Sequence, residues 1–131
     1  MRLWVAFASD YEENFECARA ATGCLAMASQ YSPIANVLRS LTNFDDMART
    51  LVQCGNLEIM QRVMVILLNM TEHGEKCIEA VKSTGSGTFC EGYVLSYHKG
   101  ENMSDLNFSD GDKQLMLATI DLAKEVAERC R

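Results

Sequence analysis

The sequence is poor in the residues that usually carry catalytic or metal chemistry. Its 131 residues include two His and one Pro, and aromatic residues make up only 8%. The six Cys form no Cys-x-x-Cys pair and have no His beside them, so the spacing of a zinc site is absent. No apolar run approaches the roughly 18 to 20 residues that span a membrane. We therefore expect no metal, no cofactor and no membrane partner.

Positive charge is also scarce. Twelve Lys and Arg stand against 18 Asp and Glu, so the formal net charge is −6 and non-specific binding to nucleic acid is not expected. Most of the Cys lie inside apolar runs, where a free thiol behaves as a small hydrophobic group. Reduced Cys are typical of a cytoplasmic protein, which is the location we predict.

The few motifs that resemble catalytic or ligand sites have simpler explanations. His73 and His98 lie beside glycines at predicted helix C-termini, where a cation complements the helix dipole. The acidic segment 105–116 resembles a calcium loop. However, its sixth position is Asp110 instead of Gly and its twelfth is Met116 instead of Glu. We therefore predict a protein that is not an enzyme.

What the sequence has in quantity is helix-forming residues. Hydrophobic residues make up 48% of the chain, and one Pro interrupts few helices. Ser9 with Glu12 reads as a capping box, and Asn56 and Ser109 read as further N-caps. Caps and glycines together predict helices over 11–29, 33–42, 44–53, 57–72, 75–83, 88–98 and 110–129, after an apolar helical segment at 3–7.

The long helices recur at a fixed spacing. Arg62 lies 43 positions after Arg19, and residues 62–70 align with residues 19–27. A helical segment repeated every 40 to 47 residues is typical of armadillo or HEAT arrays, and short-medium-long helix triplets favour armadillo. We predict an all-α armadillo-repeat right-handed superhelix. Its parts are the end of one repeat at 1–30, a full repeat at 33–73 and a terminal repeat at 75–131 with an inserted loop at 100–109.

The two ends of the chain differ in character. The last helix is rich in charge, as in a terminal capping helix, whereas Leu3, Trp4 and Phe7 make the first residues apolar. A solenoid needs a polar cap at both ends. We therefore predict a C-terminal fragment of a longer array, which self-associates at high concentration through these three apolar residues.

Polar residues recur at corresponding places on the long helices. Asn69 interrupts an apolar run, and Arg62 lies seven positions earlier on the same helix face. Stacked in parallel, the helices would present a polar ladder that can hold an extended peptide. The predicted protein-binding groove residues are Arg19, Arg62, Asn69 and Gln114. Only Asn69 matches the usual groove asparagine, because Ala26 and Asp121 stand in the equivalent places.

A local explanation of the same residues remains open. Arg62 could pair with Glu58 one turn away, and Asn69 could cap a neighbouring turn. The four residues would then hold the fold together without contacting a partner.

Two long segments resemble a known family. Residues 3–21, LWVAFASDYEENFECARAA, look like the C-terminal part of the UCS domain of animal myosin-directed chaperones, and residues 56–70 are similar to its next long helix. The resemblance implies a curved armadillo stack that binds the myosin motor domain and assists its folding and assembly, in muscle development among other settings. Full-length members also dock a heat-shock chaperone through 34-residue tetratricopeptide repeats, and none is present in these 131 residues. The alternative function is a structural C-terminal cap without client contact.

Overall fold

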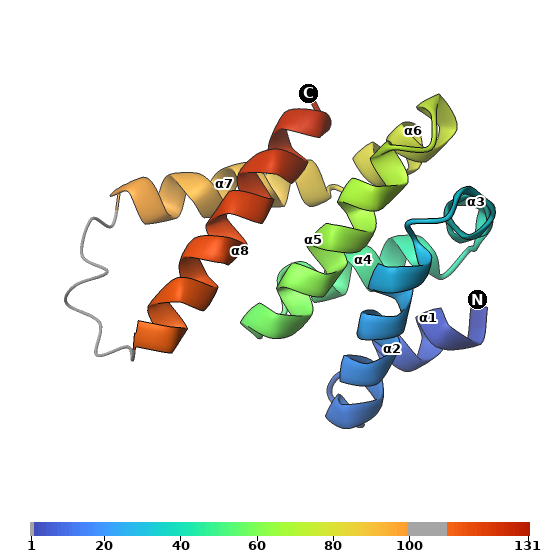
Figure 1. The fold of residues 1–131 in the computed structure, drawn as a ribbon, viewed down its shortest axis with the longest axis horizontal. Helices are drawn as coiled ribbons and strands as arrows, with labels where there is room; N and C mark the ends of the chain where they lie inside the picture. Colours follow the sequence, from blue (N-terminus) through green and yellow to red (C-terminus); the bar gives the residue numbers. More distant parts are fainter. Residues whose placement is uncertain (1, 100–109) are drawn as a thin grey trace.

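Every regular element that the structure describes is an α-helix. The computed structural model describes residues 2–99 and 110–131, and the predicted all-α class is confirmed over that range. The predicted inserted loop 100–109 and the predicted cap Ser109 lie outside the described residues. The helices are α1 Arg2–Ser9, α2 Phe15–Ala28, α3 Ser32–Ser40, α4 Phe44–Leu51, α5 Leu57–Thr71, α6 Glu75–Ser83, α7 Ser86–Lys99 and α8 Asp110–Arg129 (Figure 1). Within the described ranges, no helix is both long and apolar enough to cross a membrane.

Three long helices lie side by side in one layer. Their order is α2, α5, α8, they run in the same direction, and α5 contacts both neighbours (Figure 1). A second layer crosses behind them: α1 packs on α2 and α4, and α7 packs on α8. The short helices α3 and α6 contact each other and α5. The layer of long helices is therefore one continuous surface with α5 at its centre.

The first long helix begins later than predicted. Ser9 does not cap it, because its Oγ donates to the carbonyl oxygen of Val5 at 2.9 Å in the last turn of α1. The cap is Asn14, whose Oδ1 accepts from the backbone N–H of Cys17 at 3.4 Å. The capping box at Ser9 is thus wrong. Val5 and Ala8 are fully buried, and this burial keeps the chain helical up to Ser9 where local signals indicated a start.

The central helix begins where predicted and ends one residue earlier, at Thr71. Asn56 caps α5, since its Oδ1 accepts from the N–H of Ile59 at 3.1 Å. Gly55 before it and Gly74 after it have φ of 87° and 102°, a region in which a side chain is strained. These local signals set where α5 begins and ends. They therefore also set the position of each of its polar residues along the helix axis.

The core is continuous from α1 to α8. Helix α5 contributes most to it, with buried side chains around much of its circumference: Ile59, Met60, Val63, Met64, Ile66, Leu67 and Met70. A helix that is apolar on so many sides is enclosed by its neighbours. The few polar side chains of α5 must therefore meet a neighbouring helix or the outer face of the layer.

Candidate protein-binding face

Two polar side chains of α5 reach across to backbone carbonyls of α2. Arg62 Nη1 donates to the carbonyl oxygen of Arg19 at 2.6 Å, and Asn69 Nδ2 donates to that of Ala26 at 3.0 Å. Asn69 Nδ2 also lies 3.0 Å from Ser29 Oγ. Each residue bonds the carbonyl 43 positions before it, so the sequence period corresponds to a physical contact. These bonds explain an amide in an apolar run, because a half-buried donor without a partner would be costly.

An ion-pair cluster surrounds the contact between Arg62 and the Arg19 carbonyl. Glu58 Oε1 lies 3.0 Å from Arg19 Nε and 2.9 Å from Arg62 Nη2, and Glu16 lies 3.7 Å from Arg19. The hydrogen bond from Arg19 to Glu58, and then the charge of Glu58, raise the pKa of the Arg19 guanidinium above its usual value. The Arg19 side chain is 46% exposed, so water screens the pairs and they orient the two guanidinium groups more than they stabilise the fold.

A second set of polar contacts, which the sequence reasoning missed, joins α5 to α8. Gln61 Nε2 donates to the carbonyl oxygen of Leu115 and to Thr119 Oγ1, both at 2.9 Å. Arg129 pairs with Glu72 at the other end of α5. Gln61 carried a signal, since it is a polar residue in the apolar run next to Arg62. No feature of the sequence distinguished Arg129 from the other charged residues of the last helix.

The structure brings three of the four predicted groove residues together. Arg19, Arg62 and Asn69 all lie along the contact between α2 and α5. Gln114 is exposed on α8, and no described contact joins it to the other three. Both contacts of the local explanation are present: Arg62 pairs with Glu58, and Asn69 bonds the last turn of α2.

Hollows on the surface lie away from these residues. One of about 260 Å³ between α7 and α8 has an apolar floor that includes Val94 and Ala127. Another of about 590 Å³ lies at the turn between α1 and α2, and Asp10, Glu12 and Glu13 are among its lining residues. Across residues 2–99 and 110–131, no three His, Cys, Asp or Glu side chains gather where they could hold a metal ion.

Comparison with known proteins adds no relative. A scan against protein-family models, a search of curated proteins and a search of solved structures each gave no match. The resemblance to myosin-directed chaperones therefore stays a prediction, and the helix arrangement and its contacts carry the functional argument.

Proposed function

We propose that the chain is an armadillo-type stack that binds a protein client, without catalysis, on the face formed by α2, α5 and α8. One observation supports this most directly: the three helices run side by side, and Arg62 and Asn69 bond α5 to α2 at the 43-residue period. Helices stacked in register expose one surface along which an extended segment can lie. The resemblance names the client as the myosin motor domain. The six free Cys support a cytoplasmic setting.

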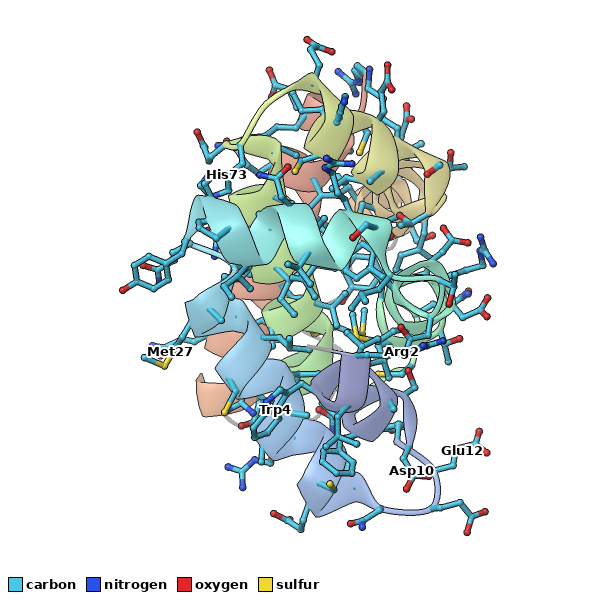
Figure 2. All side chains as sticks on the ribbon, turned by 90° about the vertical axis from the view of Figure 1, so that its right-hand side faces the viewer. Arg2, Trp4, Asp10, Glu12, Met27 and His73 are labelled. Atoms are coloured by element: carbon cyan, nitrogen blue, oxygen red, sulfur yellow. The ribbon has the colours of Figure 1, made fainter. Side chains whose placement is uncertain are left out.

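The four groove residues have different parts in this proposal. Arg19 and Gln114 are exposed and offer their side chains to the client. Arg62 and Asn69 hold α5 against α2 with their donors. The Asn69 Oδ1 accepts no hydrogen bond from the described residues, so it can accept one from a client N–H. Met27, 71% exposed on the outer side of the same layer, adds an apolar contact (Figure 2).

Binding to purified myosin motor domain tests the proposal. We expect the wild-type chain to bind and to reduce heat-induced aggregation of the motor. We expect Arg19→Ala and Gln114→Ala each to weaken binding by roughly fivefold, about 1 kcal/mol for one interface side chain. Lys76→Ala, an exposed change on α6, is the matched control and should bind as wild type. Failure of the wild type to bind would contradict the proposal that the myosin motor domain is the client. Equal binding by all four proteins would contradict the proposal that Arg19 and Gln114 contact it.

A structural cap without client contact is the second candidate. It is favoured by the fact that Arg62 already donates to α2 and to Glu58 on its own helix, and that Asn69 already donates to α2. Under this alternative, Arg62→Ala and Asn69→Ala lower the free energy of unfolding, while Arg19→Ala and Gln114→Ala change nothing that a motor-binding assay measures.

A further inference from the structure

Two free thiols lie where the start of α7 packs on the end of α8. Cys130 directly follows α8, and a Cβ atom on Gly87, in the first turn of α7, would lie 3.0 Å from Cys130 Sγ. The sulfur atom can come this close because Gly87 has no side chain. Cys90 lies three residues further along α7, and side chains three apart are neighbours on a helix face. The Cys90 side chain is therefore the next one that the Cys130 sulfur meets along α7.

The surroundings of Cys90 leave Cys130 as its partner. Cys90 is 0% exposed, and burial, followed by the charge of Cys130, raises the pKa of its thiol to about 12. A charge acts on a neighbouring thiol in this way only at short range. Cys77, on the adjacent α6, lies against α3, where its Sγ is 3.9 Å from Asn36 Oδ1. The remaining three Cys lie on α2 and in the turn before α5: Cys17, Cys24 and Cys54.

Cys130 is the thiol of this pair that a dissolved oxidant can reach. It is partly exposed, whereas Cys90 is fully buried. Burial raises the pKa of the Cys130 thiol, while the charge of Lys82 and a hydrogen bond with the Gly87 backbone act in the opposite direction. Lys side chains and helix N-termini are surroundings that stabilise a thiolate. Thiols that respond to oxidants are typically accessible and have a second Cys beside them, which completes the disulfide.

We propose that Cys130 and Cys90 are a redox-responsive pair, in which hydrogen peroxide drives a reversible disulfide that locks the start of α7 to the end of α8. A disulfide needs about 3.8 Å between Cβ atoms. Helix ends fray, so Cys130, one residue beyond α8, can move to that spacing. The bond joins α8, one helix of the long-helix layer, to the second layer behind it, and so goes beyond the proposed client binding.

The oxidation takes two steps. The Cys130 thiolate attacks one peroxide oxygen, the O–O bond breaks, and the other oxygen takes up a proton and leaves as water. This converts Cys130 to a sulfenic acid. Cys90 Sγ then attacks Cys130 Sγ and loses its proton, and the hydroxyl group leaves as a second water. The two thiols together give up the two electrons that reduce the peroxide, and a dithiol reductant returns both electrons to restore them.

Peptide mapping of the peroxide-treated native chain tests the pairing. After free thiols are blocked and the chain is digested without reductant, we expect one linked pair of peptides, containing Cys90 and Cys130, which dithiothreitol separates. Cys130→Ser, a change at a partly exposed position, should fold by circular dichroism and lack the link. Cys24→Ser, a matched change at the exposed Cys of α2, should form it as wild type does. Linkage of Cys90 or Cys130 to another Cys, or no linkage within the chain, overturns the proposal.

Two further measurements test the order of the steps and the lock. In Cys90→Ala the reaction should stop at the sulfenic acid, so dimedone should label Cys130; labelling of another Cys instead overturns the order. The disulfide closes a loop of about 40 residues, so it should raise the ratio of folded to unfolded chain on the order of a hundredfold. The urea midpoint of the wild type should therefore rise on peroxide treatment and fall back with dithiothreitol, whereas that of Cys130→Ser should not change. A linked chain with an unchanged midpoint overturns the lock.

Discussion

Replacing Asn69 by Leu separates two explanations of this residue. Composition alone predicts stabilisation, because the flanking residues Leu68 and Met70 are apolar and Leu favours a helix by about 0.5 kcal/mol over Asn. The contacts predict the opposite. The Asn69 amide donates to the carbonyl oxygen of Ala26 and contacts Ser29 Oγ, each at 3.0 Å across the α2–α5 contact.

The expected magnitudes follow from these two bonds. Each contributes about 1 kcal/mol net, so losing both costs about 2 kcal/mol. The gain from a half-buried Leu side chain and its helix propensity is about 1 kcal/mol. We therefore expect Asn69→Leu to lower the free energy of unfolding by about 1 kcal/mol. Asn69→Ala lacks most of the apolar gain and should lower it by about 2 kcal/mol.

Urea denaturation and amide hydrogen exchange measure the two parts of this prediction. The midpoint should fall without a change in slope, in the order wild type, Asn69→Leu, Asn69→Ala. Exchange should quicken in the last turn of α2, around Ser29, since that turn loses its bonds to α5. Asn36→Ala is the control, because the Asn36 amide bonds Ser32 and Arg39 of α3 and Cys77 of α6 and no residue of α2, so it should leave α2 unaffected. An Asn69→Leu protein more stable than wild type would refute the reasoning.

Three further predictions concern Gly87 and Cys90 on α7 and Gly23 on α2. A methyl group at Gly87 would lie 2.4 Å from Cys130 Cβ, so Gly87→Ala should separate α7 from α8 and lower the free energy of unfolding by roughly 2 kcal/mol in urea. An unchanged midpoint would show that the two helices yield freely. Burial raises the pKa of the Cys90 thiol to about 12. The unfolded chain releases this proton near pH 9 while the folded chain keeps it. Stability should therefore fall above pH 9, by up to about 1.4 kcal/mol per pH unit, and Cys90→Ala should remove this contribution in denaturation at pH 8 to 10 with reductant. Equal slopes for the two proteins would contradict the burial argument. A Cβ at Gly23 would make only an ordinary contact, 3.5 Å from Arg62 Nη1, so Gly23→Ala should raise the free energy of unfolding by up to about 1 kcal/mol. A loss of stability would show that Arg62 has no room to move.

Helix ends were predictable where local chemistry decided them. Asn56 and Gly55 set the start of α5, because a cap and a left-handed glycine act within a few residues. Ser9 shows where this fails. It has the residue type of a cap, but the burial of Val5 and Ala8 against α2 and α4 extends α1 through it, and no local pattern reports that contact.

For the candidate site, too, part was predictable from local sequence and part depended on tertiary packing. The sequence by itself determined the helical class and the 43-residue period, because side-chain periodicity and capping are properties of neighbouring residues. It also marked Arg62 and Asn69 as polar residues that need a reason. Only the tertiary structure decided what that reason is: their donors meet the carbonyls of Arg19 and Ala26. On a helix enclosed by α2 on one side and α8 on the other, a polar side chain can meet either neighbour or a partner. The packing of the whole stack selects among these, and no single segment encodes that choice.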